Sequence, residues 1–184
     1  MNLGYIISSI ISGLIMLSLL ALNHHVSRTG GEQTMYRMAD IRAELVLELI
    51  AEDFRAMGYR VESAPVVAAD SHQIRFRAHF EGDEDPTEIR WQFDQGAMVS
   101  PDNPSISPLY RIVDGNQQMV SAGVTRFRLE YLDEHRQTFE PDPATYDEIR
   151  QIRLELVTES AEGYDNRHFG RSSRTTEITP LHLH

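Results

Sequence analysis

The sequence contains no cysteine and no lysine, and its 17 basic residues are all arginine. The absence of cysteine excludes disulfide bonds, thiolate catalysis and zinc sites built on cysteine ligands. It does not identify a cellular compartment, because an exported protein can fold without disulfides.

Positive charge is scarce as well. The 184 residues include 28 acids against 17 bases, which gives a formal net charge of −11 at pH 7. A nucleic-acid-binding domain normally needs a basic face that displaces counterions from phosphates, so nucleic acid is not expected as a partner. The balance fits an acidic surface that repels other copies of itself.

A long apolar run stands at the start of the sequence. Leu3 to Leu22 carries no charge, and the first charged side chain is Arg28. About 20 helical residues span roughly 30 Å, the thickness of the hydrocarbon core of a bilayer. A cleaved secretory signal is the alternative interpretation. Against it, no basic residue precedes the run, the run exceeds the usual ~7–15 residues, and Ser18 to Asn23 offers no clear cleavage motif. We therefore expect a retained transmembrane helix.

A second helical segment, amphipathic this time, is predicted over residues 32–58. The polar stretch 23–31 precedes it and contains the pair Gly30-Gly31, so the long helix is expected to loosen or bend there. We therefore divide the chain into residues 1–31, the membrane helix with its hinge, and a globular domain over 32–184. Gly58 is expected to cap the helix. The apolar residues that recur at helical spacing, and are expected to pack on a sheet, are Met35, Met38, Ile41, Leu45, Leu49, Ile50, Phe54 and Met57.

Beyond residue 61 the apolar period changes from 3.6 to 2, which is typical of strands with one wet face. Alternation predicts strands near 74–80, 89–93, 127–131 and 152–156, with shorter ones at 109–113, 118–121 and 175–181. Asp114-Gly115 is a strong hairpin signal. Residues 161–173 are expected to form a loop. No helical pattern separates successive strands, so we expect an antiparallel sheet over 61–184 and an α+β fold.

The polar faces of these strands carry arginine and glutamate together. Arg126 and Arg128 precede Glu130 on one predicted strand, and Glu155 follows Arg153 on another. Cross-strand ion pairing is expected, rather than a basic stripe.

Candidate catalytic or ligand sites are weak. The best metal candidate is the acidic loop with Asp83, Glu84 and Asp85, since clustered carboxylates suit calcium. It lacks the spacing of an EF-hand, and a solvated turn is the favoured interpretation. His24 and His25 are adjacent and do not share a helix face. No nucleophile or phosphate-loop motif occurs, so we expect no catalytic residue, no cofactor and no small-molecule substrate.

Several segments resemble the type IV pilins and the pseudopilins of type II secretion. The helix end Glu52 to Tyr59 (EDFRAMGY) resembles the D-L-R-x-A-G-Y pattern of PilW-type minor pilins, and more distantly that of J-type pseudopilins. Val124 to Leu132 and Ile149 to Ser160 are similar to paired strands of that family in order and spacing. Ile178 to Leu183 lies where such proteins have their final strand.

The N-terminus departs from the family pattern. By analogy the family's peptidase would cut after Gly4 and leave the aromatic Tyr5 as the new first residue. Ser9 then stands at the fifth mature position, where the family has glutamate. A carboxylate within the membrane is costly unless it meets a partner charge such as the N-terminus of an adjacent subunit. A subunit with serine there lacks that attraction, as do some minor subunits thought to sit at a filament tip.

The resemblance implies a non-enzymatic subunit of a type IV pilus or type II secretion filament, which acts in assembly priming or at the tip. Its partners would be sibling subunits, contacted through the N-terminal helix, and the inner membrane, with the sheet domain on the periplasmic or outer side. Charge alone slightly favours the opposite orientation, because Arg28, Arg37 and Arg42 follow the apolar run. The main alternative is a single-pass membrane-anchored scaffold or binding domain that does not polymerise. An enzyme with a site assembled from scattered residues is a third.

Overall fold

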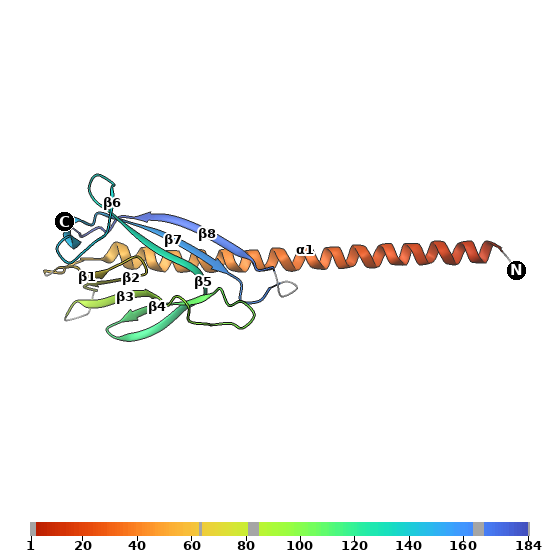
Figure 1. The fold of residues 1–184 in the computed structure, drawn as a ribbon, viewed down its shortest axis with the longest axis horizontal. Helices are drawn as coiled ribbons and strands as arrows, with labels where there is room; N and C mark the ends of the chain where they lie inside the picture. The colour runs from red at the N-terminus through yellow and green to blue at the C-terminus, as the bar shows by residue number, and fades with distance from the viewer. Residues whose placement is uncertain (1–2, 63, 81–84, 164–167, 184) are drawn as a thin grey trace.

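The computed structural model of the chain describes residues 3–62, 64–80, 85–163 and 168–183. It has one long N-terminal helix and an antiparallel sheet packed on the C-terminal half of that helix (Figure 1). The α+β expectation is confirmed. The N-terminal half of the helix projects away from the sheet, so the two ends of the chain lie far apart.

Helix α1 runs without interruption over Leu3–Ala56, 54 residues or roughly 80 Å. The expected loosening at 23–31 is therefore wrong. Thr29 and Thr34 return their hydroxyls to the carbonyls of His25 and Gly30, at 3.1 and 2.9 Å, and Arg28 pairs with Glu32 one turn on. The polar stretch stays within the helix despite its two glycines, and the Arg28–Glu32 pair adds a small stabilisation on its surface.

The helix ends where Gly58 adopts φ +80°, a conformation open to glycine because it has no Cβ. The Gly58 N–H donates to the Arg77 carbonyl at 3.0 Å. A Cβ at this position would lie 2.6 Å from the His182 carbonyl oxygen, so glycine is required for space as well. The expected cap is confirmed.

The sheet follows the order β1-β2-β3-β4-β5-β7-β8, with every neighbouring pair antiparallel and β6 paired to the end of β5. The elements are β1 Val66–Ala69, β2 Gln73–Ala78, β3 Thr87–Phe93, β4 Ser107–Val113, β5 Asn116–Leu132, β6 Thr138–Phe139, the 3₁₀ turn η1 Tyr146–Glu148, β7 Gln151–Glu159 and β8 Arg171–Ile178. Asp114 and Gly115 turn the β4–β5 hairpin with positive φ, as expected.

Strands β1 and β6 were not expected from the sequence, and β5 and β8 differ in extent from the expected strands. β5 is a single strand of 17 residues that pairs with β4 through its first half and with β7 through its second. β8 begins at Arg171, four residues before the expected start and inside the expected loop, and it ends at Ile178 rather than Leu181. Its sequence, RSSRTTEI, has no apolar alternation to mark its start. The strand lies at the border of the sheet and forms through its ladder with β7.

Candidate functional site

The face of α1 that packs on the sheet has small residues toward its N-terminal end and larger ones toward the C-terminus of the helix. Ala39, Ala43, Val46, Ile50 and Phe54 are all buried and recur every three or four residues. α1 crosses β5, β7 and β8 on this face. The buried Thr158 hydroxyl of β7 donates to the Ala39 carbonyl at 2.9 Å.

At the N-terminal end of this contact the backbones of the helix and of the sheet domain approach each other directly. A Cβ on Gly170, just before β8, would lie 2.3 Å from the Met35 carbonyl carbon and 2.5 Å from the Tyr36 nitrogen. At that separation only glycine fits at position 170. Further along the helix the inward row continues with the fully buried Ala39 and Ala43, whose small side chains suit a helix packed this closely on the sheet.

Several of the large apolar residues expected to face the sheet therefore face outward instead. Met38 and Ile41 are each 57% exposed and Leu45 is 61% exposed. Ile50, Phe54 and Met57 are buried as expected. The error arose because this helix carries two apolar rows at helical spacing, on different sides, and only one of them faces the sheet. Ranking by hydrophobicity favours methionine, isoleucine and leucine, whereas the fold buries the alanines.

This outward row, Met38, Ile41 and Leu45, is the candidate functional surface. In the part of the chain that the structure describes, one helix is long and apolar enough to span a membrane, and its apolar window shows no burial against the sheet. The row lies on that same helix, C-terminal to the apolar run. Exposed side chains of the run include Ile10, Leu14, Leu17 and Leu20.

The sequence motif at the helix end forms a buried polar cluster that sequence reasoning did not identify. The Asp53 side chain, 5% exposed, accepts hydrogen bonds from Arg111 Nε at 2.7 Å, Arg111 Nη2 at 2.8 Å and Trp91 Nε1 at 2.8 Å. The bonds to Asp53 raise the pKa of the Arg111 guanidinium. This cluster ties α1 to β3 and β4. The available signal was an aspartate on the inward helix face together with the one tryptophan.

The outer face of the sheet carries the expected cross-strand ion pairs. Arg126 pairs with Glu155 at 3.0 Å, and Arg153 reaches both Glu130 at 3.1 Å and Glu177 at 2.9 Å. The hydrogen bonds with its two carboxylates raise the pKa of Arg153, and the bond from Arg153 lowers the pKa of Glu177. Exposed pairs of this kind contribute little to stability each.

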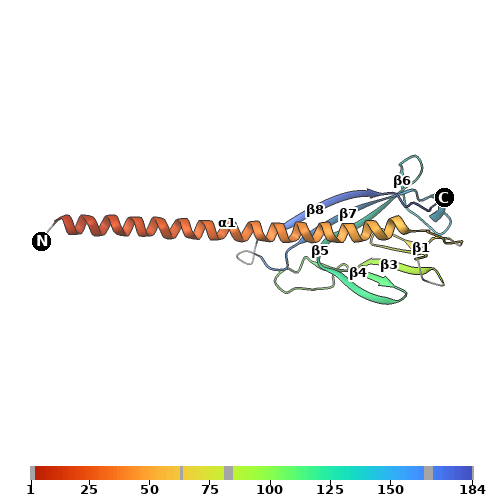
Figure 2. The same cartoon turned by 180° about the vertical axis from the view of Figure 1, so that it is seen from behind.

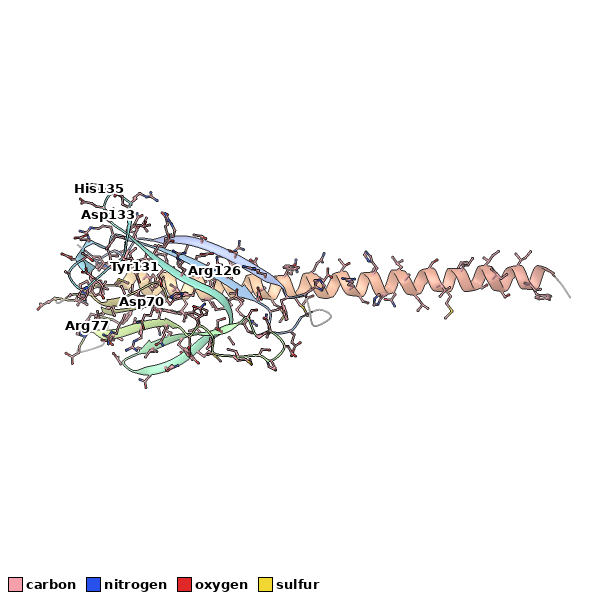
Figure 3. All side chains as sticks on the ribbon, in the orientation of Figure 1. Asp70, Arg77, Arg126, Tyr131, Asp133 and His135 are labelled. Atoms are coloured by element: carbon pink, nitrogen blue, oxygen red, sulfur yellow. The ribbon has the colours of Figure 1, made fainter. Side chains whose placement is uncertain are left out.

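A groove of about 510 Å³ lies between the β1–β2 turn and β5–β6, lined partly by Asp70, Ser71 and Tyr131. Figure 3 shows the labelled Asp70 and Tyr131 beside one another at this end of the domain, and the Tyr131 hydroxyl donates to the Asp70 carbonyl at 2.8 Å. Burial raises the pKa of Tyr131 well above 10.0, and the charge of Asp70 adds to this. The groove mixes both signs of charge and does not point to a particular ligand.

The residues singled out from the sequence are only partly placed. Asp83 and Glu84 lie outside the described residues, and Asp85 is exposed. Within the described ranges no group of three or more His, Asp or Glu side chains is arranged to hold a metal ion. Gly4, Tyr5 and Ser9 lie in the first turns of α1, with Tyr5 exposed. The Ser9 hydroxyl donates to the Ile6 carbonyl at 2.9 Å.

Comparison with known proteins adds no family. The chain matches no protein-family model and no curated protein.

Proposed function

We propose that this protein is a non-enzymatic, minor pilin-like or pseudopilin-like subunit of a type IV pilus or type II secretion filament. In this role the apolar half of α1 holds the protein in the inner membrane before assembly and packs against the helices of sibling subunits afterwards. The sheet domain lies on the periplasmic or outer side, where it contacts siblings during priming or at the filament tip.

The observation that carries the proposal is the outward row Met38, Ile41 and Leu45. Leu45 lies 23 residues beyond Leu22, or roughly 35 Å further along the helix, more than the thickness of a hydrocarbon core. A helix that served only as an anchor would have no need of apolar side chains there. Burying each of the three against another helix would contribute about 1–2 kcal/mol, because each is already partly covered.

The segment between the membrane run and the row also suits close helix packing. Gly30 has open space around the position of a Cβ, and the neighbouring residues are small or short, as in Ser27 and Thr34. Small residues spaced one turn apart let helix backbones approach one another. The uninterrupted helix presents this segment and the outward row on one rigid element.

One observation favours the alternative of an anchored scaffold that does not polymerise. Ser9 occupies the place of the family glutamate, and its hydroxyl is bonded within its own helix. No carboxylate is present there to attract the N-terminus of a neighbour. Under the filament proposal, a subunit with Ser9 would stand at the end of the filament, where one of its two neighbours is missing and the carboxylate is not needed.

Photo-crosslinking from single positions of α1 separates the two functions. A photoreactive phenylalanine analogue replaces Ile41 or Leu45 in the native host, and Tyr36, which is 55% exposed on the same helix, is the matched control. We expect adducts from positions 41 and 45 that map, by mass spectrometry, to the apolar helix of another single-pass protein. Adducts from these positions that are no more abundant than those from position 36 would exclude helix packing through the row.

The intact mass of the protein from its native membrane tests processing. A chain that begins at Tyr5 would show that a prepilin peptidase accepts the sequence despite Ser9 and the unusual leader. A chain that begins at Met1 would leave a permanent anchor and favour the scaffold.

A further inference from the structure

Strand β8 forms one border of the sheet, and none of the described strands pairs with its outer edge. Among the described strands β8 pairs with β7 alone, and in both cartoon views no strand runs alongside its outer edge (Figure 2). Eight residues form this edge, and none of them is a proline. Natural sheets usually shorten or interrupt such edges, because a row of unpaired backbone groups recruits additional strands.

The hydrogen-bonding phase shows which backbone groups are available. The Ser160 N–H donates to the Gly170 carbonyl at 2.9 Å, so the pair 160/170 is a hydrogen-bonded pair of the ladder. Such pairs alternate along antiparallel strands. Ser172, Arg174 and Thr176 therefore direct their N–H and C=O groups toward β7. The backbone groups of Ser173, Thr175 and Glu177 point outward, and no described strand pairs with them.

A groove of about 410 Å³ lies beside this edge, between β8 and α1. The helix contributes Glu44, Glu48 and the apolar Leu47 and Ala51; the strand contributes Arg174 and Thr176. A strand added to β8 would place every second side chain over this groove and the others on the outer face of the sheet.

The charges beside the edge are unbalanced. Arg174 donates to Asp40 at 2.6 Å, Glu177 is paired with Arg153, and Arg171 lies 3.9 Å from Glu159, so the three ionic residues of β8 already have partners. Neither Glu44 nor Glu48 has a cationic partner within the described residues. These two carboxylates are one helical turn apart, about 6 Å along the axis, while alternate residues of a strand are about 6.6 Å apart. A strand with basic residues at alternate positions matches that spacing.

We propose that the outer edge of β8 binds an extended segment of a partner protein as an additional strand, with two basic side chains of that segment directed at Glu44 and Glu48. Backbone bonds to Ser173, Thr175 and Glu177 supply affinity, and the two glutamates supply selectivity. A second copy of this chain is disfavoured, because each copy carries a net charge of −11 and brings its own acidic groove to the contact. The proposal is independent of the filament role, since it uses neither the outward row nor the membrane segment.

The test uses the full chain in detergent micelles and a fluorescent ten-residue peptide that alternates arginine and valine. A second peptide has the same sequence with its backbone nitrogens methylated at alternate residues, which removes the donors needed for strand pairing. We expect the first peptide to bind and the methylated peptide to bind at least about tenfold more weakly, measured by fluorescence anisotropy. Equal binding of the two peptides, or no binding at about 1 mM, would overturn the proposal.

Variants of the protein locate the binding site. Thr175→Pro removes one outward N–H and leaves the ladder to β7 intact, so it should weaken binding by about tenfold or more without unfolding the domain. The emission of the buried Trp91 verifies that the sheet remains folded. Unchanged binding by folded Thr175→Pro would place the peptide elsewhere.

A matched pair of charge variants tests selectivity. Glu44→Gln with Glu48→Gln should weaken binding about tenfold, whereas Glu134→Gln with Glu140→Gln, two exposed acids outside the groove, should leave binding nearly unchanged. The two double variants have the same net charge. Equal losses in both would show a general attraction to an acidic protein and would contradict the assigned groove.

Discussion

The buried cluster of Asp53, Arg111 and Trp91 supports a quantitative prediction about stability. Replacing Asp53 by asparagine keeps the shape of the side chain but removes its charge and one of its two acceptor oxygens. Three donated hydrogen bonds converge on this carboxylate, which is 5% exposed. The substitution therefore acts on bonding alone and creates no cavity.

The loss of stability in Asp53→Asn depends on which hydrogen bonds the asparagine can still accept. A hydrogen bond to a charged group contributes about 1.5–3 kcal/mol. An asparagine oxygen in the place of Oδ2 can still accept from Trp91 Nε1 and Arg111 Nε, but these bonds lose the carboxylate charge, and the asparagine NH₂ group would face the donor Arg111 Nη2. Arg111 is 23% exposed and can recover part of its hydration, which reduces the loss. We expect Asp53→Asn to lower the free energy of unfolding by about 3 kcal/mol, or roughly 9–15 °C in Tm for a domain of this size.

Removal of the other partner should be more damaging. Arg111→Met leaves an unpaired carboxylate at a site that is almost inaccessible to water, so a loss of about 4 kcal/mol is expected. The double variant contains neither charge. Its loss should be smaller than the sum of the two single losses by at least about 2 kcal/mol.

The assay is denaturant unfolding of the full chain in detergent, followed by the emission of Trp91. This is the one tryptophan of the sequence and it is fully buried in the sheet, so its emission reports the sheet domain rather than the membrane helix. Glu134→Gln on the surface is the control and should change stability by less than about 0.5 kcal/mol. Additive losses for the two single variants would refute the coupling, and an unchanged Asp53→Asn would refute the cluster itself.

Two further predictions concern backbone proximity and a buried phenol. Gly170→Ala should destabilise the domain by about 2–3 kcal/mol, because the added Cβ would lie 2.3 Å from the helix backbone. Gly30→Ala is the control and should not destabilise the protein, because the space around Gly30 is open. Thermal unfolding compares the two variants, and equal effects would contradict the close contact. For Tyr131 the folded-state pKa is raised by burial, so its contribution to stability is complete below pH 10.0 and is lost as the pH rises through the raised value. At pH 7 Tyr131→Phe should therefore be less stable than the wild type by about 1 kcal/mol, because it lacks one hydrogen bond. Between pH 9 and 11 the variant should lose less stability than the wild type. Parallel profiles of unfolding free energy against pH would argue against the buried phenol.

The features of this protein that the sequence determined are local and periodic. The uncharged run before Arg28 was sufficient to predict a helix of membrane length, and the alternation in β2, β3 and β7 was sufficient to predict those strands. Asp114-Gly115 specified its hairpin, because the turn needs two residues that tolerate positive φ. Each of these signals depends on residues that are near neighbours in the chain.

Tertiary structure decided which side of each element is buried and where the sheet ends. The large side chains of Met38, Ile41 and Leu45 are outside because another face of the helix, with Ala39, Ala43 and Val46, packs on the sheet. The sequence predicted only the second half of β8, from Thr175, and the strand begins at Arg171 because β7 offers it a ladder as far as that residue. Asp53 is buried because Trp91 and Arg111 come to it from two strands distant in the chain. These outcomes depend on contacts between distant segments, which a pattern of neighbouring residues does not encode.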